Sequence, residues 1–129
     1  MHKSFLVLGA LLGALAVGLG AFGAHGLKGV VSPESIAIFQ TGVQYQMYHS
    51  LALLIAGSVS DRLQSEWIKW AGNFFAFGIL LFSGSLYLIT ALTASGKPVP
   101  TTVGVLTPAG GLCFIAGWLF LLTGVLKKL

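Results

Sequence analysis

Charged residues are scarce in this chain of 129 residues. Only 8% of the residues are charged, whereas 56% are hydrophobic, and the mean hydropathy is +0.92. Soluble domains carry about 25% charged residues, so this chain has too few to cover a surface that faces water. The shortage excludes an ordinary soluble domain and favours a protein of the lipid bilayer.

Carboxylates are the scarcest of the charged groups, and none lies in a long apolar run. The three are Glu34, Asp61 and Glu66. Small proton-coupled exporters generally need a carboxylate within the membrane, where buried charge is rare and functional, so only histidine remains for that task. The single cysteine, Cys113, excludes an intramolecular disulfide. Because metal sites typically take three or four ligands, we predict no metal site.

The seven basic residues give a net charge of +4 but form no patch. They lie at the ends of apolar runs, which argues against a nucleic-acid partner and instead predicts membrane orientation. One side of the membrane would hold Lys3, Arg62, Lys69, Lys127 and Lys128, and the other only Lys28 and Lys97. The positive-inside rule therefore predicts that both termini lie inside.

Four apolar segments are long enough to cross a bilayer. They cover residues of about 4–24, 40–59, 70–94 and 107–126. The sequence thus predicts an all-α integral membrane protein, a bundle of four transmembrane helices in one domain, 1–129. We interpret the first segment as a retained helix, although its basic start and apolar centre resemble a signal peptide.

The second span is preceded by a helix-start signal at Ser32-Pro33-Glu34. Serine is a favoured N-cap, and proline is favoured at the first helical position. We expect a short interfacial helix there, before the membrane span begins near Gln40. The other prolines are Pro98, Pro100 and Pro108. We place all four in loops or at helix starts, so that none interrupts a span.

Small residues recur at regular spacing in the first and fourth spans. The first stripe is Gly9, Gly13, Ala16, Gly20 and Gly23, and the second is Gly110, Gly117 and Gly124. Such stripes let helix backbones approach closely in lipid. We interpret them as packing faces, within one chain or between chains. Because so short a chain has little interior, we expect a homo-oligomer or a larger membrane complex.

A polar stretch in the second span carries the strongest candidate site. Gln40, Gln44 and Tyr48 recur every four residues, as do Thr41, Tyr45 and His49, and together they predict one broad polar face. Counting along the helices puts His49 near the membrane midplane. At similar depth lie Ser83, Ser85 and the indole of Trp118. We expect these side chains to cluster with His49.

Three interpretations of this cluster remain open. Its groups satisfy one another by hydrogen bonds between helices, or they fix a lipid or small molecule in an apolar pocket, or His49 ligates haem or a metal. Haem would need His25 as a second axial ligand, near the outer end of the first span. For His25 we favour a role at the helix end, where Gly26 would end the helix in a left-handed turn.

Four motifs in order resemble the YgdD-like family of small inner-membrane proteins, also named domain of unknown function 423. They are GAFGAHGLKG at 20–29, FQTGVQYQMYHSLALL at 39–54, FSGSLYL at 82–88 and TPAGGLCFIAGW at 107–118. The resemblance implies a multi-pass protein of the bacterial cytoplasmic (inner) membrane and carries no catalytic residues. It suggests hallmark positions at Gly23–Gly26, Tyr48–His49 and Pro108–Gly111.

We therefore favour a non-enzymatic membrane protein with membrane lipids as partners. It would serve as a structural or accessory protein, or bind a lipid or small ligand, and we predict no cofactor. The alternative is a small transporter or channel with a polar path around His49. A haem- or quinone-associated redox subunit is the third possibility.

Overall fold

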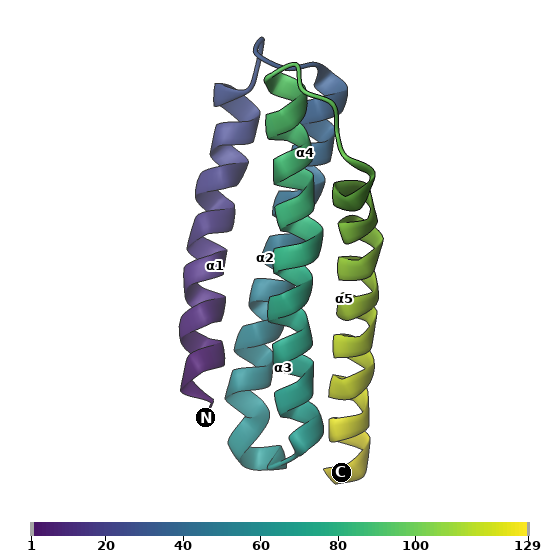
Figure 1. Ribbon diagram of the computed structural model, residues 1–129. Coiled ribbons are helices and arrows are strands. Elements are labelled where there is room, and N and C mark those ends of the chain that lie inside the picture. The colour runs from purple at the N-terminus through teal and green to yellow at the C-terminus, as the bar shows by residue number, and fades with distance from the viewer. Residues whose placement is uncertain (1, 129) are drawn as a thin grey trace.

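Four long helical rods stand side by side in the computed structural model, which describes residues 2–128, without the side chain of Lys128. The first rod is α1 (Lys3–Ala21) and the π-helical turn η1 (Phe22–Gly26), and the second is α2 (Pro33–Leu63). The third joins α3 (Glu66–Gly78), the π-helical turn η2 (Ile79–Ser83) and α4 (Gly84–Ala94), and the fourth is α5 (Thr101–Lys128). Both termini lie at the same end (Figure 1).

The expected all-helical fold is confirmed for the described residues, where the only extended pairing is an isolated bridge between Lys28 and Val31. Three rods are long and apolar enough to cross a membrane: Lys3–Gly26, Glu66–Ala94 and Thr101–Lys127. The 31 residues of α2 are also long enough, but its glutamines, tyrosines and histidine lower its hydropathy. Its passage through a membrane therefore stays a prediction.

The second rod begins at the predicted signal but has no separate interfacial helix. Ser32 is the N-cap, and its Oγ accepts a hydrogen bond from the Ser35 N–H at 3.2 Å. The helix then runs unbroken from Pro33 to Leu63. The expectation of a distinct interfacial helix is wrong because neither glycine nor proline breaks the chain before Phe39, which is itself buried.

The fourth rod starts earlier than expected and contains a proline. Two backbone N–H groups, of Val103 and Gly104, donate to the Pro100 carbonyl at 3.1 and 3.3 Å and so start α5 before Thr107. Pro108 therefore lies inside the helix, which corrects the expectation that no proline does. Its ring crowds the carbonyl of the residue four positions earlier. That residue is Gly104, which has no side chain, and a Cβ there would meet no neighbouring helix within 4 Å.

Helix α2 is the central element of the packing. It contacts α1 on one side and the third rod on the other, and α5 packs mainly on the third rod. The principal core lies between these rods and includes Phe5, Leu53, Ile68, Phe75 and Phe114. Figure 1 shows the resulting row, with α1 and α5 at its two edges.

Both small-residue stripes face other helices of the same chain. A Cβ on Gly9 would lie 2.8 Å from the Ser50 carbonyl oxygen, and one on Gly23 would lie 2.8 Å from the Phe39 ring, both in α2. The second stripe, on α5, faces the third rod. A Cβ on Gly124 would lie 2.5 Å from the Ile68 side chain, and one on Gly117 would lie 2.7 Å from the Phe75 ring. A Cβ on Gly110 would meet the Phe82 backbone. Gly13, Ala16 and Gly20 complete the first stripe, toward Ser50 and Val43.

The end of the first rod differs from the sequence expectation. Gly26 belongs to η1, and the left-handed residue is Gly29, with φ of 79°. A Cβ on Gly26 would lie 2.6 Å from the Phe22 ring, so Gly26 makes room for that ring and does not turn the chain. His25 is exposed, and its ring makes no hydrogen bond to the described residues. The interaction with the helix dipole stays a prediction.

Candidate functional site

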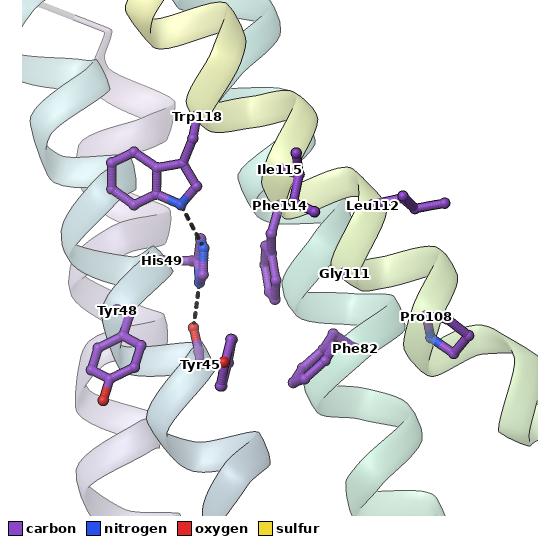
Figure 2. A pocket seen from close by; sticks show the side chains of 10 residues that line it. All are labelled: Tyr45, Tyr48, His49, Phe82, Pro108, Gly111, Leu112, Phe114, Ile115 and Trp118. Carbon is purple, nitrogen blue, oxygen red and sulfur yellow. Dashed lines mark hydrogen bonds between the residues drawn. The ribbon is translucent and has the colours of Figure 1, made fainter.

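His49 joins the second and fourth rods near the middle of α2. Only 3% of its surface is exposed. Its ring stacks on Phe114 with centroids 3.6 Å apart and an interplanar angle of 9°. The Trp118 indole N–H donates to Nε2 of His49 at 3.0 Å, and Nδ1 lies 2.7 Å from the Tyr45 carbonyl oxygen. Figure 2 shows this chain of two hydrogen bonds.

The hydrogen bonds determine which tautomer His49 adopts. An indole N–H only donates, so Nε2 of His49 must be the acceptor. Nδ1 then carries the proton and donates it to the Tyr45 carbonyl. Because both ring nitrogens are engaged, neither is available to ligate haem iron or another metal in this arrangement. His25, which haem would need as its second axial ligand, lies in η1 at the end of the first rod, whereas His49 lies near the middle of α2.

A groove of about 770 Å³ opens beside this histidine, between α2 and α5. Ligand pockets commonly measure about 300–1,000 Å³ and are mostly apolar. The groove lies within this range of volumes, and none of its lining residues is charged. The lining residues, all labelled in Figure 2, are Tyr45, Tyr48, His49, Phe82, Pro108, Gly111, Leu112, Phe114, Ile115 and Trp118.

The π-helical turn η2 helps to form the inner wall of the groove. Such turns shift the faces of a helix and often mark functional sites. Phe82, in this turn, packs against the Tyr45 ring with centroids 4.7 Å apart and against Phe114 at 5.5 Å. Gly110 lets α5 approach the Phe82 backbone closely. The turn and the glycine together place the Phe82 and Phe114 rings behind the groove.

The two tyrosines form the outer edge of the groove on α2. Tyr45 is 38% exposed and Tyr48 is 54% exposed. Their rings contact each other edge to face, with centroids 5.7 Å apart. Neither hydroxyl has a hydrogen-bond partner among the described residues. The groove therefore offers two free phenol groups at its edge.

Four other predicted site residues lie away from the groove. Ser83 donates to the Gly42 carbonyl at 2.6 Å, and Ser85 lies 2.6 Å from the Thr107 hydroxyl. Gln40 donates to the Gly20 carbonyl at 3.1 Å. Gln44 is exposed. The expected single polar face is thus divided, because the two serines and Gln40 form hydrogen bonds to other helices at points away from His49.

Sequence reasoning missed a second polar centre at Gln46. The side-chain amide of Gln46 donates to the Leu12 carbonyl at 2.8 Å and accepts from the Tyr87 hydroxyl at 2.6 Å. The backbone carbonyl of Gln46 accepts from the Ser50 hydroxyl at 2.6 Å. Gln46 is only 3% exposed. The available signal was its spacing of four from Gly42 and from Ser50, the small residues of α2 that face other helices.

Apolar rods of membrane-spanning length, with polar groups paired inside and an aromatic groove at the side, define a helical membrane protein. A family model described as "Protein of unknown function (DUF423)" matches residues 19–111. The chain belongs to this family, which confirms the resemblance found in the sequence.

Several bacterial relatives are similar over nearly their whole length, and each is named a membrane protein. A UPF0382 membrane protein of Staphylococcus haemolyticus is 45% identical over 125 residues, which is 97% of both chains. One from Staphylococcus epidermidis is 46% identical over the same length and coverage. The UPF0382 membrane protein YwdK of Bacillus subtilis is 41% identical over 128 residues, 98% of this chain and 99% of its own. No solved structure matches.

Proposed function

We propose that this protein crosses the bacterial cytoplasmic membrane four times and binds a neutral, membrane-soluble ligand in the groove between α2 and α5. The observation that carries the proposal is the groove itself, with its apolar lining and its two free phenol groups.

The polar contacts of α2 support its passage through the membrane. A spanning segment must satisfy its buried polar groups without water. Gln46, His49 and Ser50 are all buried and hydrogen-bonded to protein groups. Helix α2 also lies between rods that are apolar enough to span. Because its buried polar groups are paired and its neighbours are apolar, α2 can cross the bilayer despite its lower hydropathy.

The ends of the rods support an orientation with both termini in the cytoplasm. Basic residues gather at the end that holds the termini and the α2–α3 connection, as the positive-inside rule requires. Trp67 lies at this end, and the Lys127 ammonium is 5.2 Å from the centre of its ring. Tryptophan is typical of the membrane interface, and a lysine beside it extends toward the headgroups.

The lining of the groove indicates the chemistry of the ligand. Leu112 is 67% exposed and Ile115 is 58% exposed, so this apolar wall faces the bilayer in the proposed placement. With no charged side chain in the lining, the groove suits an uncharged molecule. The ligand would place an apolar body against the aromatic rings and one hydroxyl or carbonyl group against a tyrosine hydroxyl.

Ligand binding fits the groove better than a proton or ion path through His49. A path needs polar groups in a continuous series, whereas the walls on either side of His49 are aromatic and aliphatic. Both nitrogens of His49 are already engaged within the protein. His49 therefore serves to hold α5 against α2 at the inner wall of the groove.

Photolabelling tests the proposal directly. Purified protein in lipid nanodiscs would be irradiated with a diazirine-bearing long-chain alcohol, and the labelled residues would be mapped by peptide mass spectrometry. We expect labelling at Tyr45–His49 and Pro108–Trp118 that an excess of unlabelled alcohol suppresses. Ile115→Trp, which fills the groove, should abolish it, while Val17→Trp on exposed α1 should not. Equal, unsuppressed labelling of all exposed apolar residues would refute ligand binding.

A further inference from the structure

One face of α2 is left uncovered by the rest of the bundle. Gln44, Tyr48, Leu51 and Ile55 recur at spacings of four, three and four, which puts them on one side of the helix. All four are exposed, with values of 54% for Tyr48, 51% for Leu51 and 48% for Ile55. We call these four residues the α2 stripe. It lies between the edge that packs on α1 and the edge that lines the groove.

The α2 stripe carries two polar groups without partners. Neither the Gln44 amide nor the Tyr48 hydroxyl makes a hydrogen bond to any described residue. Tyr48 is the middle residue of α2 (Pro33–Leu63), and Gln44 is about 6 Å from it along the axis. In a bilayer with a hydrocarbon core of about 30 Å, both groups lie where neither water nor lipid headgroups reach them.

We propose that the α2 stripe binds the same stripe of a second copy of this chain, about a twofold axis parallel to the membrane normal. Such an axis leaves both copies in the same orientation and places each residue at the depth of its own counterpart. Gln44 then meets Gln44 of the second copy. A primary amide both donates and accepts hydrogen bonds, so two copies satisfy each other without any other partner.

The remaining residues of the α2 stripe suit such a pairing. Leu51 and Ile55 supply apolar contact one and two turns below Tyr48, and the stripe carries no charge between Gln44 and Ile55. Arg62 continues this side of the helix, but it lies near the helix end at the polar boundary. Membrane helices cross at an angle, so two copies that meet near Gln44 and Leu51 diverge before Arg62.

The second copy explains the free amide better than a lipid does. Phospholipid polar groups lie at the interface, far from Gln44, and acyl chains offer no hydrogen bond. The inference rests on the proposed membrane placement, although not on the ligand. Tyr48 borders both surfaces, so the second copy would form an outer boundary of the groove and leave its α5 side open to the bilayer.

Disulfide trapping in native membranes tests the pairing. In a Cys113→Ala background, Leu51→Cys is expected to form a disulfide-linked dimer on oxidation with copper phenanthroline. Val17→Cys is the matched control, because Val17 on α1 is at least as exposed as Leu51, at 64% against 51%, and it is expected to stay monomeric. Adding Gln44→Leu to Leu51→Cys should lower the dimer yield about threefold, as expected for losing a modest hydrogen bond between membrane helices. Gln44→Asn should retain more of the yield than leucine.

Two results would overturn the pairing. One is equal cross-linking of Leu51→Cys and Val17→Cys, which would indicate random collision. The other is a Leu51→Cys protein that remains monomeric while circular dichroism shows a native helical fold. Suppressible photolabelling of the groove in such a monomer would leave the ligand proposal intact. Because Gln44 is exposed and its amide makes no hydrogen bond to any described residue, its substitution is expected to leave the fold unchanged.

Discussion

The indole N–H of Trp118 donates a hydrogen bond to Nε2 of His49 at 3.0 Å. This bond links α5 to α2 across an otherwise apolar contact and determines the tautomer of the histidine. It also places both side chains in the wall of the groove. The stability of the bundle and the shape of its candidate site therefore depend on the same pair.

Trp118→Phe should destabilise the protein by about 1 kcal/mol, because it leaves Nε2 of His49 without its donor. His49→Leu should also destabilise it, since the leucine loses the stacking on Phe114 and leaves the indole unpaired. The double variant should cost less than the sum of the two single variants. Unfolding in mixed micelles, followed by circular dichroism, measures the three values. Strict additivity would show that the bond contributes nothing.

The buried centre at Gln46 leads to a second prediction. Gln46→Leu should cost about 2 kcal/mol, because the half-buried Tyr87 then lacks the acceptor of its hydroxyl and the Leu12 carbonyl lacks its donor. Tyr87→Phe, added to Gln46→Leu, should cost little more, because the hydroxyl is no longer there to be left unpaired. The same unfolding measurement applies. A large further loss from Tyr87→Phe would mean that the hydroxyl has another role.

Two glycines of α1 provide a matched pair of variants. Gly9→Ala puts a methyl group 2.8 Å from the Ser50 carbonyl oxygen and should destabilise the protein by about 1–3 kcal/mol through overpacking. Gly18→Ala meets nothing within 4 Å and should stabilise the helix by up to about 1 kcal/mol. Thermal unfolding of the two variants checks the difference. Equal effects would contradict the packing of α1 on α2.

The proposed orientation predicts which loops a reagent reaches. In a Cys113→Ala background, Lys97→Cys should react with a membrane-impermeant maleimide added to intact cells, because it lies opposite the termini. Glu66→Cys should react only after the membrane is permeabilised. The reverse pattern would invert the topology, and reaction of both in intact cells would contradict four crossings.

Much of the fold follows from local sequence features. Hydropathy marks three of the four rods, and the serine, proline and acid at the start of α2 determine where that helix begins. The small-residue stripes identify packing faces, but they do not say whether a partner lies in the same chain. That answer depends on which helices become neighbours, and in this chain both stripes meet helices of the same chain.

The site was harder to predict than the rods. Counting residues along each rod puts His49 and Trp118 at similar depth, and the structure joins them. The same counting wrongly grouped Ser83 and Ser85 with them, because it ignores rotation about the helix axis. The π-helical turn η2 adds to that rotation, and no feature of its sequence, ILLFS at 79–83, predicts such a turn. Gln46 was missed because three glutamines lie close together and only contacts show which one is buried.

Quenching of Trp118 fluorescence tests ligand binding in the groove most directly. A protein with Trp67→Phe and Trp70→Phe retains only Trp118, and one with Trp70→Phe and Trp118→Phe retains only Trp67. Both would be titrated in nanodiscs with a bromine-bearing long-chain alcohol, since bromine quenches tryptophan on contact. Binding in the groove predicts quenching of Trp118 that saturates at low alcohol content, and no saturation for Trp67. Identical, unsaturated quenching of both tryptophans would contradict it.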